Sequence, residues 1–384
     1  MRDERIDLLR GLGLINMLWS HSLVLGHIYV LIFYMNPSYV GISDGADLFV
    51  FLSGWLFGSV YLRLHDQAGL KSTVPKALRR ILQLYGTHLL CIAGLWLILN
   101  ISQQMGWPTL REARELLAPT PNLWKEVLLL RYLPPGVDIL PLYMVLLLGM
   151  PFLLAFYRHS PRAAVGLSMG MWLVPFLAPG LNPPRYPSLG SDGLWFFYPL
   201  SWQFLFVLGA IAQERQQHLH VPGRWRNEIL LGSLGFVMVV PIVRLTQAII
   251  HSPSASPDLE FYQYLMQTEL FGGDKRTQGP IRILNFFAIL LLVKGILPDR
   301  QHLKRSTLTR VLSLPGRYPL PIYVVSTLGS YAVGAHTMYH GNPWLFWGEV
   351  MLVWLACLCL AYAREKWENR NRTLITEARV PTPS

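Results

Sequence analysis

Ten long apolar runs constrain this chain more than any other feature of its sequence. An apolar run of about 20 residues is long enough to cross a bilayer as a helix, which satisfies its own backbone hydrogen bonds where lipid offers none. The sequence therefore predicts an all-α fold, a polytopic membrane helical bundle of about ten transmembrane helices. The runs fall near residues 9–33, 47–62, 81–101, 139–157, 163–178, 197–213, 229–250, 281–297, 319–338 and 345–363.

The basic residues indicate how these helices are oriented. If the N-terminus is cytosolic, 24 of the 33 Lys and Arg residues lie in cytosolic segments and nine lie elsewhere, as the positive-inside rule requires. Both termini are then in the cytosol (N-in/C-in). The net charge of +11 reflects this topology, so nucleic-acid binding is not expected. We expect a membrane domain of residues 1–363 and a polar, disordered cytosolic tail of residues 364–384.

Two further segments and the cysteines complete this outline. The outer loops 102–138 and 251–280 are long, and the first contains an amphipathic stretch from Leu110 to Leu117. The first apolar run is too long for a cleaved signal peptide and lacks a small-residue cleavage site. Cys91, Cys357 and Cys359 lie inside apolar runs at spacings that predict neither a disulfide nor a metal site.

The first span carries a polar face. Asp7, Arg10, Leu14, Met17 and His21 recur at spacings of three or four residues. Arg10 and His21 therefore point the same way and lie about 16 Å apart along the axis, which puts His21 near the bilayer midplane. An imidazole at that depth is costly unless it faces the bundle interior, which favours a functional role. The alternative is a packing histidine that bonds to a neighbouring helix.

The second span begins with GADLFVFLSGWLFG, residues 45–58, in which Asp47, Gly54 and Gly58 share one helical face. The glycines permit close approach of either a helix or a ligand chain. Asp44 and Asp47 at the outer mouth have two interpretations. They could orient a histidine or bind a sugar, or they could simply cap a helix.

The third span begins with basic residues. Arg79 and Arg80 lie at its cytosolic edge, where they either bind donor phosphates or anchor the helix. His88 lies about 12 Å further in. Polar residues also occur at or inside other spans. These are Asp138 with Tyr143, Trp202 with Gln203, Arg244 and Arg317. Arg244 interrupts an apolar run, which is typical of a functional residue, although its side chain could snorkel to the surface.

The sequence resembles a known family. GADLFVFLSGW is similar to the second-helix signature of the acyltransferase-3 superfamily, and Arg10 with His21 matches the arginine–histidine pattern of its first helix. More narrowly, the chain resembles the OpgC group, which attaches succinyl groups to osmoregulated periplasmic glucans. Ser20 stands where relatives often have an acidic residue. The matching segments are residues 5–21, 47–55, 79–90, 137–154, 197–210 and 313–324.

The resemblance implies a multi-pass protein of the bacterial inner membrane. Its co-substrate would be cytosolic acyl-CoA, in particular succinyl-CoA, with no bound cofactor. Its acceptor would be a periplasmic glucan, and glucan-synthesis proteins are conceivable partners. By the same resemblance His21 is the reacting base, while Arg79 and Arg80 bind the donor. Direct transfer and a covalent acyl-histidine remain alternatives.

Together, the residues and the resemblance predict three sets of site residues. The catalytic set is His21, Asp47 and His88. The donor-binding set is Arg10, Arg79, Arg80 and Arg317. The acceptor or acyl-pocket set is Asp44, Asp138, Tyr143, Trp202, Gln203 and Arg244.

Three alternatives to a glucan succinyltransferase remain open. An O-acetyltransferase of another cell-surface polysaccharide would have the same layout. A glycan or polyprenyl transporter should show helices broken by Gly or Pro in paired halves, and the sequence shows no such halves. A non-catalytic scaffold for glycan synthesis would have no use for histidines at mid-membrane depth.

Overall fold

The computed structural model describes residues 4–27, 42–185, 193–216, 225–250, 275–296 and 306–377. These residues form helices joined by turns and contain no strand, only an isolated bridge between Pro184 and Leu194. The predicted all-α class is confirmed for this part of the chain. The chain forms two compact units. We call residues 1–28 with 298–384 the terminal unit, and residues 29–297 the central unit.

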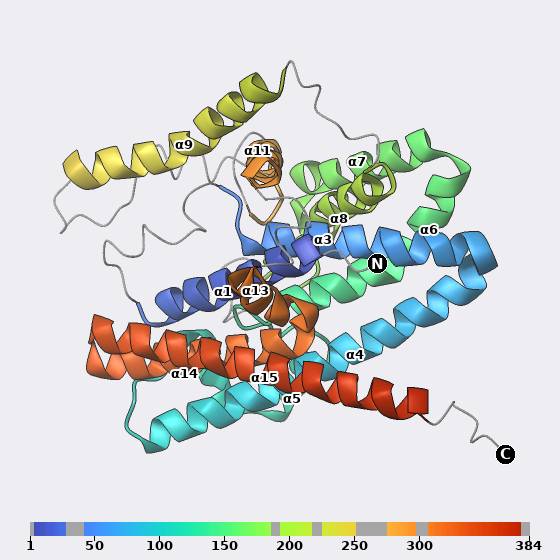
Figure 1. Ribbon diagram of the computed structural model, residues 1–384. Coiled ribbons are helices and arrows are strands. Elements are labelled where there is room, and N and C mark those ends of the chain that lie inside the picture. Colours follow the sequence, from blue (N-terminus) through green and yellow to red (C-terminus); the bar gives the residue numbers. More distant parts are fainter. Residues whose placement is uncertain are drawn as a thin grey trace. The chain divides into compact units, whose positions relative to one another are not determined.

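The helices of each unit are shown in Figure 1. The terminal unit contains α1 (Glu4–Leu25), α13 (Thr307–Arg317), α14 (Pro319–His340) and α15 (Pro343–Glu377). The central unit contains α3 (Gly45–Phe57), η2 (Gly58–Leu62), α4 (Arg63–Gln104), η3 (Arg111–Leu117), α5 (Pro121–Leu128), α6 (Ile139–His159), α7 (Pro161–Leu177), η4 (Pro179–Leu181), α8 (Pro199–Glu214), α9 (Arg226–Ile250) and α11 (Pro280–Ile296).

In the described residues, each predicted run overlaps a helical segment of the structure. By length and composition, four segments are able to cross a membrane: Glu4–Leu25, Gly45–Gln104, Ile139–His159 and Pro343–Asn371. These helices are consistent with a membrane protein, while the number of ten crossings and the N-in/C-in topology stay predictions. The four segments expose large apolar side chains, among them Leu97, Leu148 and Leu352, as expected of helices that contact lipid.

Glycine pairs set the closest helix contacts in both units. In the central unit a Cβ on Gly54 would lie 1.9 Å from the carbonyl oxygen of Phe206, and one on Gly209 would lie 2.1 Å from that of Phe51. Helices α3 and α8 therefore touch backbone to backbone. Of the two interpretations of Gly54 and Gly58, helix packing is confirmed, because Gly58 also abuts α8, at Ala210.

Glycines also allow close helix contact in the terminal unit. A Cβ on Gly11 of α1 would lie 1.9 Å from the carbonyl oxygen of Leu312, and one on Gly316 would lie 1.9 Å from that of Asp7. No side chain fits in this space, so α1 and α13 cross in direct contact. Further along α1, the hydroxyl of Ser330 donates to the carbonyl of Leu18 (3.3 Å) and ties α14 to the same helix.

Several element boundaries differ from the expected ones. Helix α4 begins at Arg63, well before the expected residue 81, and is broken at Gly69, which has the left-handed φ of +61°. Helix α15 continues to Glu377, so the expected tail from residue 364 is helical up to that point. In the first outer loop, Arg111–Leu117 forms a 3₁₀ helix. Most of the second outer loop, residues 251–274, and residues 378–384 lie outside the described residues.

Candidate functional site

A buried ion pair occupies one end of the central unit. Asp47 of α3 and Arg282 of α11 are 0% and 1% exposed, and the Arg282 Nη2 atom lies 2.6 Å from Asp47 Oδ2. Arg282 Nε also donates to Asp47 Oδ1 (3.2 Å), and the Gln278 side-chain amide donates to the same oxygen (2.7 Å). The backbone N–H of Asp44 completes the set at Oδ2 (2.8 Å). Both carboxylate oxygens of Asp47 are thus bonded within the chain.

Asp44 extends this network toward the surface. Its side chain caps α3 by accepting from the N–H of Ala46 (2.9 Å), and its role at a sugar stays a prediction. The carboxylate also lies 2.6 Å from Lys275 Nζ and 3.4 Å from Arg282 Nη2. Burial by itself would raise the pKa of Asp44, but the positive charges of Lys275 and Arg282 more than offset this and hold the pKa below its usual range.

Asp138 lies immediately before α6 and close to the same cations. Burial raises the pKa of Asp138 to about 6, and the positive charges of Arg185 and Lys275 only partly oppose the rise. Asp44 and Asp138 therefore both interact with Lys275 but differ in protonation, since Asp44 remains ionised while Asp138 takes up a proton in mildly acidic solution. We call Asp44, Asp47, Asp138, Lys275 and Arg282 the carboxylate cluster.

Aromatic side chains surround Lys275. Its ammonium lies 5.7 Å and 5.6 Å from the ring centres of Phe196 and Phe197, a cation–π geometry. The indole N–H of Trp202 donates to the Lys275 carbonyl (3.0 Å), and that of Trp172 donates to the Gln278 carbonyl (2.9 Å). Helices α7 and α8 thereby fix the turn that carries Lys275 and Gln278.

The structure brings together four predicted residues: Asp44, Asp47, Asp138 and Trp202. The partners Lys275, Gln278 and Arg282 were not predicted. An arginine at the start of the apolar run 281–297, with a carboxylate at the start of another run, was the signal that could have found the Arg282 pair.

The remaining predicted acceptor residues lie elsewhere in the central unit. The Gln203 amide donates to the Ser168 carbonyl (2.6 Å) and accepts from the Ser168 hydroxyl (2.8 Å), so it joins α8 to α7. Tyr143 is half-buried on α6. Arg244 belongs to α9, and its side chain lies outside the described ones.

His88 lies on α4 with its side chain completely buried. Among the described residues neither ring nitrogen makes a hydrogen bond of normal geometry, although the backbone of Val137 lies near the ring. A buried polar group without a hydrogen-bond partner destabilises the fold. Because no hydrogen bond of normal geometry within the described part of the chain offsets this cost, the His88 imidazole is a candidate for a functional role.

The predicted donor-binding arginines of α4 line its accessible side. Arg79 is exposed, and Arg80 donates to the side-chain oxygen of Gln83 (2.5 Å). The ammonium of Lys76 lies 5.8 Å from the ring centre of Tyr61. The exposed Arg79 is thus accessible to an anionic ligand.

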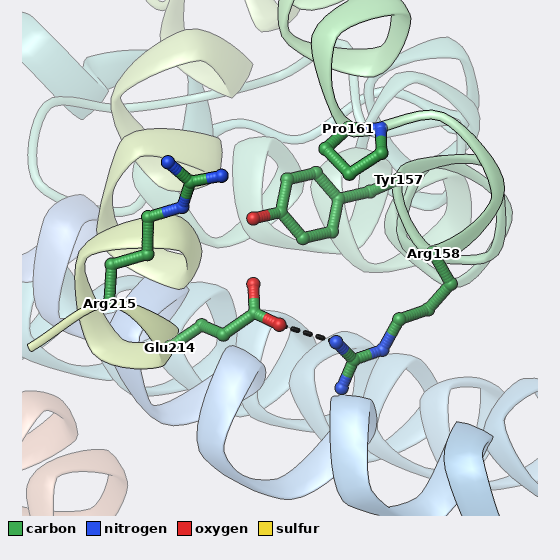
Figure 2. Close-up of a pocket in the computed structure, with 5 residues that line it drawn as sticks. All are labelled: Tyr157, Arg158, Pro161, Glu214 and Arg215. Carbon is green, nitrogen blue, oxygen red and sulfur yellow. Dashed lines mark hydrogen bonds and ion pairs between the residues drawn. The ribbon is translucent and has the colours of Figure 1, made fainter.

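A cavity of about 440 Å³ lies where α6, α7 and α8 meet, and it is lined by Tyr157, Arg158, Pro161, Glu214 and Arg215. Figure 2 shows Arg158 and Arg215 on opposite sides of Tyr157 and Glu214. Arg158 pairs with Glu214 and with Asp66, whose Oδ2 atom lies 2.6 Å from Nη2. Arg158 and Arg215 are not among the predicted site residues; they belong to the basic residues assigned to cytosolic segments.

The terminal unit holds the other predicted residues. His21 and Arg10 are half-buried on α1, while Asp7, Leu14 and Met17 of the same face are buried. This burial agrees with the predicted inward face of the first helix. Arg317 at the end of α13 pairs with Glu365 of α15, and its Nε atom lies 4.0 Å from Asp7 Oδ2.

Long apolar helices that carry buried charged residues and a buried histidine are typical of a helical membrane protein. The chain belongs to the OpgC family, because the family model described as OpgC protein matches residues 2–370. Membership of this family indicates a membrane acyltransferase that acts on glucans. No curated protein and no solved structure matches the chain.

Proposed function

We propose that this protein transfers an acyl group, preferentially succinyl, from cytosolic acyl-CoA to hydroxyl groups of a periplasmic glucan, and that it does so in the bacterial inner membrane. The observation that carries the proposal is the family match across residues 2–370. The half-buried His21, on an apolar helix able to cross a membrane, supports it.

His21 is the proposed general base. Its neutral imidazole removes the proton from a glucose hydroxyl while that oxygen attacks the thioester carbonyl of the donor. The carbon–oxygen bond forms and the carbon–sulfur bond breaks. The CoA thiolate leaves and takes up the proton from the imidazolium, which regenerates the base. General base catalysis of this kind contributes roughly 10²–10⁴-fold to the rate.

The donor's phosphates need cations. Arg79, which is exposed, and Arg80, which is half-buried, are the proposed ligands on α4, because a guanidinium can bind phosphate with two parallel hydrogen bonds. Arg10 and Arg317 are further donor-binding candidates in the terminal unit. Arg317 would have to exchange its bond to Glu365 for one to phosphate.

The acceptor is proposed to bind at the carboxylate cluster. Carboxylates accept hydrogen bonds from sugar hydroxyls, and the aromatic rings around Lys275 provide apolar faces. Asp44 and Asp138 are the candidates for these contacts. Asp47 supports them without touching the sugar, because its oxygens are bonded to Arg282, Gln278 and Asp44.

The test uses membranes that contain the protein, labelled succinyl-CoA and glucan. We expect label on the glucan with the wild type and a loss of roughly 10²-fold or more with His21→Ala. His159→Ala, a histidine change at the exposed end of α6, is the matched control and should keep normal transfer. A folded His21→Ala protein that labels glucan at the wild-type rate would remove His21 from the reaction.

The acyl preference is tested at Arg244. The free carboxylate of a succinyl group needs a cation, whereas an acetyl group does not. Arg244→Ala should therefore reduce succinyl transfer more than acetyl transfer, measured as the ratio of the two rates with the respective acyl-CoA. Equal losses would contradict a role for Arg244 in acyl recognition.

A further inference from the structure

Two histidines and a glutamate converge in the terminal unit, and none of them is among the residues predicted to act in acyl transfer. His336 and His340 lie four residues apart and hence on one face of α14, and Glu349 faces them from α15. One ligand atom from each residue lies within 4.8 Å of the other two. We propose that His336, His340 and Glu349 bind a divalent transition-metal ion of the zinc class.

The turn between α14 and α15 builds this arrangement. Gly341 ends α14 with the left-handed φ of +62°, which a residue with a side chain rarely adopts. Asn342 then starts α15, since its side-chain oxygen accepts from the N–H of Trp344 (2.9 Å) and from that of Leu345 (3.4 Å). Further contact comes from Trp19 and Trp347, whose ring centres lie 5.3 Å apart. Glu349 is therefore held two turns into α15, opposite the histidine face.

The ligand atoms of His336, His340 and Glu349 are of the kinds that zinc prefers, and they lie close together. The Nδ1 atom of His336 contacts Oε1 of Glu349, and Nε2 of His340 lies 3.4 Å from the same oxygen. Two histidines with one carboxylate form a common ligand set for zinc, with the remaining position open to water. Nitrogen and oxygen ligands bind zinc at about 2.0–2.2 Å, so small side-chain rotations close the site.

Two buried atoms of the cluster make no hydrogen bond with the described residues. Among the described residues, neither Nε2 of His340 nor Oε2 of Glu349 has a hydrogen-bond partner. A carboxylate on an apolar helix that can cross a membrane is costly. A bound cation would satisfy both atoms and neutralise the carboxylate, whereas the histidine contacts alone leave Oε2 unsatisfied.

Metal binding should break a hydrogen bond in the turn between α14 and α15. The N–H of Asn342 donates to Nδ1 of His340 (2.8 Å), so the neutral ring carries its proton on Nε2. A metal ion at Nε2 requires the other tautomer, with the proton on Nδ1, and that nitrogen then no longer accepts from Asn342. Binding should therefore release the Asn342 N–H while it joins α14 to α15.

The first experiment measures metal on the full-length protein purified without chelator. We expect one zinc ion per chain by elemental analysis, and visible absorption bands of tetrahedral Co²⁺ after exchange. His340→Gln and Glu349→Gln should each weaken zinc binding by about 100-fold or more, because losses of 10–100-fold already follow changes to groups behind the ligands. His159→Gln is the matched control and should retain the metal.

The second experiment stays informative if a variant folds poorly. Hydrogen exchange on wild-type protein, with and without Zn²⁺, should show faster exchange at Asn342 when zinc is bound. Absence of zinc after purification, together with no binding in a Zn²⁺ titration, would overturn the proposal. Binding that survives both Gln variants, or unchanged exchange at Asn342 with zinc bound, would also contradict it.

Discussion

At the residue scale, Asp47 and Arg282 form a buried ion pair in the central unit. Both side chains are shielded from water, so removing one partner leaves an uncompensated charge. Arg282→Met should lower the free energy of unfolding by about 3–5 kcal/mol. The measurement is denaturant unfolding in detergent micelles, with the exposed Arg111→Met as control.

The double variant Asp47→Leu/Arg282→Met distinguishes a pair from two separate effects. Because it leaves no unpaired buried charge, it should be more stable than Arg282→Met alone. Additive losses from the two changes would contradict the pairing.

Asp138 gives a pH-dependent prediction. Its pKa of about 6 in the folded protein exceeds the ordinary value of 3.8, so the unfolded chain gives up this proton more readily. The side chain therefore destabilises the fold progressively as the pH rises from about 4 to 6, by up to about 3 kcal/mol at higher pH. Asp138→Asn should raise the free energy of unfolding at pH 8 and have little effect near pH 4.

The check is a series of unfolding curves between pH 4 and pH 8, with Glu228→Gln, an exposed carboxylate, as control. A stabilisation by Asp138→Asn that does not vary with pH would show that the raised pKa is not its cause.

His88 provides the third prediction at this scale. Since its buried ring nitrogens lack normal hydrogen bonds among the described residues, His88→Leu should raise the free energy of unfolding by about 1–3 kcal/mol. If the imidazole takes part in acyl transfer, the same variant should lose labelling of glucan. Cys91→Ala, one turn away on α4, is the control. A stable His88→Leu protein with normal transfer would assign the ring to packing.

The sequence located individual polar residues better than their partners. Helical spacing correctly put Asp7 with Leu14 and Met17 on a buried face of α1. The sequence shows a charged residue at the start of each of two apolar runs, but the pairing of Asp47 with Arg282 follows from tertiary packing, because these residues are 235 positions apart. His336 and His340 differ from Asp47 and Arg282 in this respect, because their spacing of four residues is visible in the sequence alone.

At the scale of elements, the apolar runs predicted most helices but neither α5 nor α13, and they did not predict where the helices end. Gly69 interrupts α4 through its backbone conformation, and α15 continues past the apolar region. Hydropathy detects neither feature, because helix formation in the polar parts depends on local propensity and not on lipid. For the glycines of α3, the spacing in the sequence predicted that they share one helical face. It did not predict that this face packs against α8.

Gly54→Ala tests the contact between α3 and α8. The added methyl group would meet the Phe206 carbonyl at 1.9 Å, so the helices must separate. Overpacking usually costs about 1–3 kcal/mol, and a clash with rigid backbone belongs at the upper end. Gly149→Ala, where a Cβ meets nothing within 4 Å, is the control. Thermal unfolding of both variants measures the difference, and equal midpoints would contradict the contact.

At the scale of the whole molecule, the charge distribution predicts orientation. With 24 of 33 basic residues in segments assigned to the cytosol, a fluorescent protein fused after Ser384 should fold and fluoresce, while alkaline phosphatase at the same site should be inactive. Alkaline phosphatase inserted in the loop of residues 102–138 should be active. An active C-terminal phosphatase fusion would contradict the N-in/C-in topology.

The crossing of α1 with α13 at Gly11 and Gly316 has a consequence for biosynthesis. Between the end of α1 at Leu25 and the start of α13 at Thr307 the ribosome must add about 280 residues, which takes roughly 15 to 55 s at 5–20 residues per second. Throughout that interval α1, which carries Arg10 and His21, has already been synthesised but cannot yet pack against α13, α14 and α15. A nascent chain stopped before residue 307 therefore leaves His21 without the environment in which it is proposed to act.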